Sequence, residues 1–172
     1  MEGLIHLYCG DGKGKTTAAV GLAVRASGAG KRVIFTQFFK DGSSSEVEVL
    51  KTLPGIQTIH ADTVRRFYHA MTPEQREQAR EDYTALFRQV TDAAKEADLL
   101  ILDEIVSACN RGVVPEGLVA DFLRSKPAQL EVVLTGREPS PAFVELADYI
   151  TEMRKLRHPF DRGVAARKGV EY

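Results

Sequence analysis

An α/β fold, with a mostly parallel β-sheet and helices on both of its faces, is predicted by three features of the sequence. Short apolar runs alternate with segments of helical periodicity along the chain. The first run, residues 4–7, is followed by a glycine-rich loop and then by small apolar residues with helical spacing. A later run, residues 99–102, is apolar without alternation, which is typical of a strand buried on both faces.

The first predicted strand leads directly into the glycine-rich loop. Residues 10–17 read Gly-Asp-Gly-Lys-Gly-Lys-Thr-Thr, and residues 18–26 are expected to be helical. The order strand, loop, helix aims backbone N–H groups and the positive end of the helix dipole at one point, where a phosphate binds. Lys15 would reach the outer phosphates, and the Thr16 hydroxyl would hold the Mg²⁺ that accompanies a nucleoside triphosphate. The predicted architecture is therefore that of a P-loop NTPase of the RecA-like type.

The first position of the loop departs from the usual pattern. Cys9 stands where most phosphate loops have glycine. Gly10 and Gly12 are expected to supply the turn instead. The alternative is a glycine-rich turn without a ligand, but a Gly-Lys-Thr-Thr run in this context is rarely accidental.

The second strand is predicted over residues 32–36, which are mainly β-branched and aromatic. Residues 37–40, Gln-Phe-Phe-Lys, follow at its carboxyl end, where parallel sheets place ligand contacts. A short helix over residues 46–53 and a third strand over residues 56–60 are expected next.

Thr72 is predicted to cap a long helix, with Pro73 at the first position and Gln75 reaching back to the cap. Beyond it, apolar residues recur every three or four positions and form one stripe that would cover the sheet. The members of this stripe are Ala79, Tyr83, Leu86, Phe87, Val90, Ala93, Ala94 and Ala97. A partner-binding face is the alternative interpretation of the stripe.

Two carboxylates, Asp103 and Glu104, follow the buried run at residues 99–102. At the carboxyl end of a central strand they would face the phosphate loop. One carboxylate can there hold Mg²⁺, while the second acts as a ligand or as a base. The alternative is a pair of ordinary exposed acids past a strand end.

The last third of the chain continues the alternation of helices and strands. Helices are expected over residues 115–124 and 142–146, and strands over residues 131–135 and 149–153. Arg137 follows the end of the first of these strands, where its charge could meet a triphosphate or a substrate.

Length and composition narrow the class of protein. A chain of 172 residues fits one domain, taken as residues 1–172, and no repeat or low-complexity linker divides it. No apolar run approaches the roughly 20 residues of a membrane span, and the amino terminus does not resemble a secretion signal. A cytoplasmic protein without membrane contact is expected. The net charge of −1 argues against nucleic acid as a partner, and the cysteines and histidines lack metal-ligand spacing.

Motifs from the first strand to the last residue are similar to those of the ATP:corrinoid adenosyltransferases of cobalamin biosynthesis. They include residues 10–19, Arg25-Ala26-x-Gly28-x-Gly30, Gln37-Phe38-x-Lys40, Leu102-Asp103-Glu104, Leu134-Thr135-Gly136-Arg137, Ala147-Asp148-x-x-Thr151-Glu152-Met153 and the run from His158 to Tyr172. The family also lacks the first glycine of the loop, so Cys9 favours the resemblance.

The resemblance implies an enzyme that transfers the 5′-deoxyadenosyl group of ATP to cobalt(I) of a corrinoid and releases inorganic triphosphate. It implies catalytic roles for Lys15, Thr16 and Glu104, and Mg²⁺ bound by Thr16, Glu104 and Asp103. The implied ATP-binding residues are Gly10, Asp11, Gly12, Lys13, Gly14, Lys15, Thr16, Thr17 and Arg25. Arg137, His158 and Phe160 are expected near the corrinoid.

One departure concerns aromatic residues. Family members place a phenylalanine and a tryptophan after the third strand, against the corrin ring, whereas this chain has no tryptophan and reads Arg-Arg-Phe-Tyr-His at residues 65–69. Phe67 and Tyr68 either take over this contact or pack in the core. The resemblance also implies a homodimer and a flavoprotein as the source of the electron.

Other functions stay open at the level of sequence. A P-loop ATPase would use Glu104 as the base that polarises water. A carrier would bind nucleotide or corrinoid without turnover. A nucleic-acid binder would depend on the basic residues 154–157 and 167–168, which are more often a solvated edge.

Overall fold

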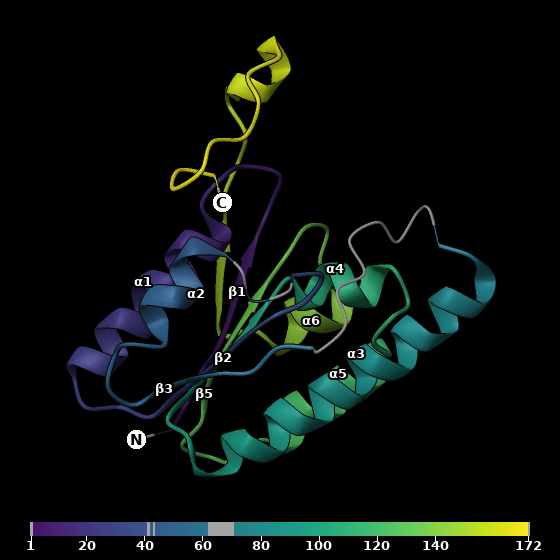
Figure 1. Cartoon of the computed structure of the whole chain (residues 1–172). Coiled ribbons are helices and arrows are strands. Elements are labelled where there is room, and N and C mark those ends of the chain that lie inside the picture. Colours follow the sequence, from purple (N-terminus) through teal and green to yellow (C-terminus); the bar gives the residue numbers. More distant parts are fainter. Residues whose placement is uncertain (1, 41, 43, 62–70, 172) are drawn as a thin grey trace.

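The computed structural model describes residues 2–40, 42, 44–61 and 71–171, and within them the strands form one six-stranded sheet (Figure 1). Neighbouring strands are parallel throughout, in the order β3-β2-β4-β5-β1-β6. The strands are β1 (Ile5–Cys9), β2 (Val33–Gln37), β3 (Ile56–Thr58), β4 (Leu99–Asp103), β5 (Glu131–Thr135) and β6 (Tyr149–Glu152). The predicted α/β fold of the P-loop NTPase type is confirmed.

Helices cover both faces of the sheet, as Figure 1 shows. One face carries α1 (Lys15–Gly28) and α2 (Ser45–Leu50). The other face carries α3 (Pro73–Ala93), α4 (Ile105–Asn110), α5 (Glu116–Ser125) and α6 (Pro141–Leu146). Two 3₁₀ turns complete the described elements, η2 (Ala94–Glu96) and η3 (Pro159–Arg162).

The central strand β4 explains why its sequence is apolar without alternation. Leu100 and Leu102 pack into the core beneath α3 to α6, whereas Leu99 and Ile101 pack into the core beneath α1 and α2. Every residue of β4 is buried, including Asp103 at its end. The apolar run of β4 therefore contributes side chains to the cores on both faces of the sheet, and the polar residue Asp103 ends the strand.

The long helix α3 begins as predicted. The Thr72 hydroxyl oxygen accepts a hydrogen bond from the Gln75 N–H at 3.3 Å, and the Gln75 side-chain oxygen accepts one from the Thr72 N–H at 3.0 Å. Residues along its stripe, such as Leu86, Phe87 and Val90, are at most 3% exposed. The stripe is core, which excludes the partner-binding alternative for these side chains.

Several bounds differ from the sequence-based prediction. The short helix α4 was missed, because its start at Ile105 has no serine or proline of the kind that marks the starts of α2 and α6. The strand β3 ends at Thr58, two residues earlier than expected, and α2 ends at Leu50. The predicted corrin-facing residues Phe67 and Tyr68 lie outside the described residues.

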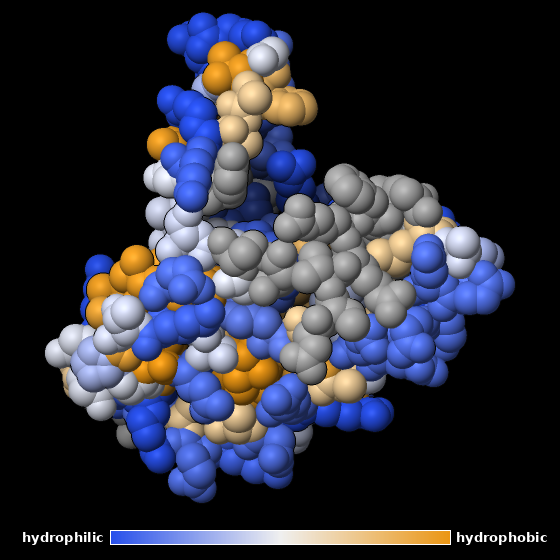
Figure 2. All heavy atoms as spheres, in the orientation of Figure 1, coloured by the Kyte–Doolittle hydropathy of each residue, from blue (hydrophilic) through white to orange (hydrophobic). Residues whose placement is uncertain are grey.

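The edge strand β6 is exposed along its whole length, and Tyr149 and Ile150 are each about half exposed. Beyond β6 the chain leaves the sheet and forms a projecting tail (Figure 1). Hydrophobic and hydrophilic atoms lie side by side on this tail in Figure 2, and Leu156 and Phe160 are 86% and 73% exposed. Within the described ranges, no helix has the length and apolar character needed to cross a lipid bilayer.

Candidate active site

The phosphate loop connects β1 to α1 at the carboxyl end of the sheet. Gly10 and Gly14 have φ values of 98° and 120°, which side chains other than glycine rarely tolerate. The helix α1 begins at Lys15, and its N-cap residue, Gly14, has no side chain that could accept a hydrogen bond from the first turn. Its first N–H groups are therefore available for an anion, and the helix dipole favours negative charge at this point.

Lys15 lies within the loop. Its Nζ donates hydrogen bonds to the carbonyl oxygens of Gly10 at 2.7 Å and Gly12 at 2.9 Å, and the residue is 7% exposed. Burial is the main cause that lowers the pKa of this ammonium group; Arg137 lowers it further, while Glu104 opposes the shift. The two carbonyl groups that bind this ammonium group are neutral, so a triphosphate bound at the loop would give it a negatively charged partner.

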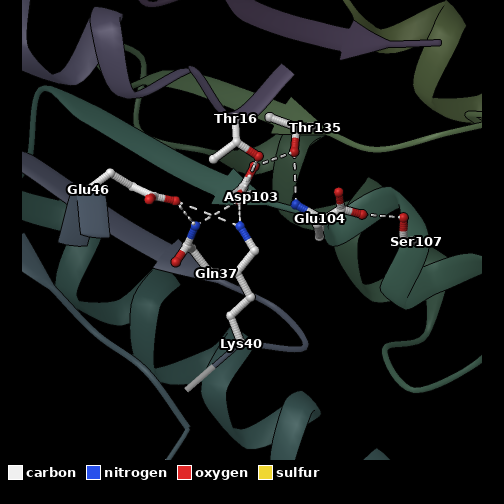
Figure 3. Close-up of polar contacts among 8 residues, drawn as sticks. All are labelled: Thr16, Gln37, Lys40, Glu46, Asp103, Glu104, Ser107 and Thr135. Atoms are coloured by element: carbon white, nitrogen blue, oxygen red, sulfur yellow. Dashed lines mark hydrogen bonds and ion pairs between the residues drawn. The ribbon is translucent and has the colours of Figure 1, made fainter. Parts of the chain in front are cut away.

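The Thr16 hydroxyl meets Asp103 across the site (Figure 3). Thr16 Oγ1 lies 2.9 Å and 3.1 Å from the two carboxylate oxygens. Asp103 also accepts hydrogen bonds from Thr135 Oγ1 at 2.7 Å and from Gln37 Nε2 at 3.1 Å. This buried carboxylate and the adjacent hydroxyl are oxygen ligands of the kind that Mg²⁺ prefers, so the residues present fit the metal.

Glu104 has an unusual backbone conformation. Its φ is 63°, in the left-handed region, and its N–H donates to Thr135 Oγ1 at 2.8 Å. Its carboxylate accepts a hydrogen bond from Ser107 Oγ at 2.5 Å (Figure 3). The two acids therefore have different surroundings. Asp103 points toward Thr16, while Glu104 is hydrogen-bonded to Ser107 in the first turn of α4, and its charge raises the pKa of Lys15.

Two side chains of the site were not anticipated from the sequence as site residues. Glu46 of α2 accepts a hydrogen bond from Gln37 Nε2 at 3.1 Å, and Ser107 holds Glu104. The Lys40 ammonium lies between two acids, 3.6 Å from an Asp103 oxygen and 3.8 Å from a Glu46 oxygen. The motif Gln37-Phe38-x-Lys40 pointed to Gln37 and Lys40, whereas Glu46 and Ser107 lie in helical segments without a local signal.

The loop is paired with the chain that leaves β6. Met153 N–H donates to the Cys9 carbonyl oxygen at 2.8 Å, and Gly12 N–H donates to the Met153 carbonyl oxygen at 2.6 Å. A Cβ atom at Gly10 or at Gly12 would lie 2.6 Å or 2.5 Å from that same carbonyl oxygen. Both positions need glycine because the backbones touch, which supports the prediction that Gly10 and Gly12 make the turn.

Two hollows flank the loop. One, of about 510 Å³, is lined by Asp11, Arg137, Lys155, His158, Phe160 and Asp161. The other, of about 400 Å³, is lined by parts of α1, α2 and the returning tail: Lys13, Thr16, Thr17, Val20, Lys40, Ser45, Glu46, Val49 and residues 169–171. The first hollow brings together Arg137, His158 and Phe160, the three residues that the family resemblance implies near the corrinoid.

A family model described as ATP:corrinoid adenosyltransferase BtuR/CobO/CobP matches residues 1–172. The chain belongs to this family.

Relatives in this adenosyltransferase family match nearly the whole chain. It is 35% identical to the corrinoid adenosyltransferase of Escherichia coli (strain K12) over 177 residues, which cover 99% of this chain and 86% of the relative. It is 34% identical to the corrinoid adenosyltransferase CobA of Salmonella typhimurium (strain LT2), with the same coverage. It is 32% identical to the corrinoid adenosyltransferase of Pseudomonas aeruginosa, over 99% of this chain and 84% of the relative.

The predicted ATP-binding residues of this adenosyltransferase do not all lie together. Lys13 and Thr17 are exposed beside the loop, and Lys13 lines the second hollow. Arg25 lies in the last turn of α1, ten residues after Lys15, which corresponds to about 15 Å along a helix axis. Its charge acts on Tyr8 of β1, whose pKa burial raises and Arg25 lowers. The contact of Arg25 with nucleotide stays a prediction.

Proposed function

We propose that this protein transfers the 5′-deoxyadenosyl group of ATP to cobalt(I) of a corrinoid and releases inorganic triphosphate. Membership of the ATP:corrinoid adenosyltransferase family supports ATP and a corrinoid as substrates. The observation that carries the proposal is the start of α1, where Lys15 lies within the phosphate loop and Thr16 contacts the buried carboxylate of Asp103. The N–H groups and the Lys15 ammonium suit the stabilisation of negative charge on a departing triphosphate, and Thr16 and Asp103 suit a metal ion bound to it.

The proposed step exchanges one bond for another. The electron pair of cobalt(I) forms a bond to the 5′ carbon of ATP, the bond from that carbon to oxygen breaks, and its electron pair leaves with the triphosphate. Cobalt is thereby oxidised by two electrons, and no proton is transferred. The protein needs neither a nucleophile nor a base: it has to align the 5′ carbon with cobalt, neutralise the leaving group and exclude water.

Lys15 and the N–H groups at the start of α1 are proposed to hold the leaving triphosphate. The Lys15 ammonium exchanges its contacts with the Gly10 and Gly12 carbonyl oxygens for phosphate oxygens. Thr16 and Asp103 would hold Mg²⁺, with Glu104 as a further ligand if its bond to Ser107 opens. Bound there, the metal would neutralise charge on the triphosphate.

The first hollow is proposed to receive the corrinoid. Arg137 lies on the side of the phosphate loop, where its charge affects both Lys15 and Asp11. His158 and Phe160 lie on the side of the tail, and the exposed ring of Phe160 offers an apolar surface to a macrocycle. Contacts of Phe67 and Tyr68 with the corrin ring belong to the same proposal and rest on the family resemblance.

Analysis of the products tests the proposed reaction. Protein, Mg-ATP and a chemically reduced corrinoid should yield a cobalt–carbon bond and one inorganic triphosphate for each bond formed. A P-loop ATPase would instead yield ADP and phosphate, and the substitution Glu104→Gln would abolish that hydrolysis. Formation of ADP and phosphate without a cobalt–carbon bond contradicts the proposal, and visible spectra together with phosphorus NMR distinguish the two outcomes.

We further propose that the single domain of residues 1–172 acts as a cytoplasmic homodimer and receives its electron from a flavoprotein. The exposed edge strand β6, with half-exposed Tyr149 and Ile150, supports association of two copies. Sedimentation of the purified chain should give twice the mass of 19.0 kDa, and a species of 19.0 kDa would exclude the dimer. Sedimentation of the chain mixed with a reduced flavoprotein tests the association of these two proteins. A complex heavier than either protein alone is expected, and separate sedimentation of the two would exclude it.

A further inference from the structure

Asp11 joins the phosphate loop to the tail. Its Oδ1 accepts a hydrogen bond from the Lys155 N–H at 2.9 Å, across 144 residues of sequence. This bond is the largest cause that lowers the pKa of the Asp11 carboxyl, and the charges of Lys155 and Arg137 act in the same direction. The side chain is therefore an anion that holds a backbone N–H, and it extends the pairing that Gly12 makes with Met153.

The chain after Lys155 forms a unit of its own. Lys155 Nζ pairs with Asp161 Oδ1 at 3.2 Å. The hydrogen bonds that follow are local ones, such as Asp161 N–H to the His158 carbonyl oxygen and Gly163 N–H to the Phe160 carbonyl oxygen. Hydrogen bonds of residues 153–155 to the phosphate loop fix where this unit begins, and residues 169–171 return beside α1 at the second hollow.

The same unit forms one wall of the first hollow. His158 and Phe160 belong to the tail, whereas Asp11 belongs to the phosphate loop and Arg137 follows β5. A change in the backbone of the loop therefore reaches the wall of the hollow through two neighbouring bonds, Gly12 to Met153 and Asp11 to Lys155.

We infer that Asp11 is a positioning residue that couples the two substrate sites, so that nucleotide bound at the phosphate loop fixes the wall of the hollow lined by His158 and Phe160. A triphosphate fixes the loop in one conformation, and the bond to Lys155 transmits this order to the tail. Because coupling between two binding sites is reciprocal, each ligand raises the affinity for the other by the same factor. The inference rests on the proposed function, which assigns the corrinoid to this hollow.

The coupling is measured with a corrinoid that cannot react. Cobalt(II) cobalamin is titrated without a reductant, in the absence and presence of saturating Mg-ATP, and the ratio of the two dissociation constants gives the coupling. The wild-type ratio should be at least about fivefold, the lower end of typical allosteric coupling. Asp11→Ala should bring the ratio close to one, whereas Asp11→Asn should keep most of it, because the amide oxygen accepts the same N–H.

Asp98→Ala is the matched control. Asp98 also accepts a hydrogen bond from a backbone N–H, that of Arg32 at 2.8 Å, but it lies just before β4, at the end of the sheet opposite the phosphate loop, so the wild-type ratio should persist. A wild-type ratio of one, or an Asp11→Ala ratio equal to the wild-type value, overturns the inference.

Hydrogen exchange of the wild-type protein provides a second measurement that needs no variant to fold. Mg-ATP alone should slow exchange of the Lys155 amide, and an unchanged rate overturns the inference. Formation of the cobalt–carbon bond by the wild-type enzyme is measured separately, so failure of the proposed function and failure of the coupling are distinguished.

Discussion

Replacing Lys15 by alanine should lower the rate of adenosylation by about 100-fold or more. The ammonium group donates to two carbonyl oxygens of the phosphate loop, and Lys15 as a whole is 7% exposed, so no other cation can take its place without rearrangement of the loop. Loss of one preorganised donor to a developing negative charge typically costs about 10²–10³ in rate. Single-turnover formation of the cobalt–carbon bond, measured at saturating ATP, checks this effect on chemistry rather than on binding.

Lys13→Ala is the control for Lys15, because it removes the same charge from the same loop at an exposed position. A smaller loss is expected for Lys13, since solvent screens its charge. A rate for Lys15→Ala within about tenfold of the wild type would remove Lys15 from the charge-stabilising role, since typical losses are far larger. Corrinoid affinity should survive in Lys15→Ala. A carrier would bind its ligands without forming a cobalt–carbon bond, so neither the wild type nor Lys15→Ala would then show a measurable rate.

Replacing Asp103 by asparagine should remove the response of the protein to Mg-ATP. The buried carboxylate accepts hydrogen bonds from Thr16, Thr135 and Gln37, and an amide would turn an NH₂ group toward one of these donors. The buried donor that faces this NH₂ group would have no acceptor, which should lower the free energy of unfolding by about 1–3 kcal/mol. Loss of the negative charge beside Thr16 should also weaken binding of the metal and, with it, of the nucleotide.

Urea unfolding with and without Mg-ATP measures both effects of Asp103→Asn. Nucleotide at 100 times its dissociation constant should stabilise the wild type by about 2.7 kcal/mol and the variant by much less. Asp121→Asn, at a position whose side chain is 78% exposed, is the control and should respond like the wild type. Equal stabilisation of Asp103→Asn and the wild type by Mg-ATP would show that Asp103 does not support the metal site.

Local features of the sequence predicted most of the fold. Unbroken apolar runs marked the buried strands, and the apolar stripe after Thr72 marked the helix that covers one face. These signals are reliable because each depends only on neighbours within a few turns or strand positions. The helix α4 escaped prediction, since its start at Ile105 carries no serine, threonine or proline signal, and only its packing against β5 reveals it.

The sequence predicted most of the residues that belong to the candidate site, but not which of them contact one another. The loop at residues 10–17 and the acids after β4 were recognised from residue type and spacing. The sequence did not reveal that Asp103 rather than Glu104 would meet Thr16, because the two acids are adjacent at the carboxyl end of the same strand. That choice depends on the left-handed backbone of Glu104, which turns its side chain toward Ser107.

By itself, the sequence determined the chemistry of the phosphate loop and the alternation of strands and helices, because short-range periodicity and glycine positions specify local structure. Only the tertiary structure decided which distant groups meet: Thr16 with Asp103, Gln37 with Glu46, and Asp11 with Lys155. The physical reason is the order of the strands. Parallel pairing brings the carboxyl ends of β1, β2, β4 and β6 to one edge of the sheet, and no local pattern encodes that order.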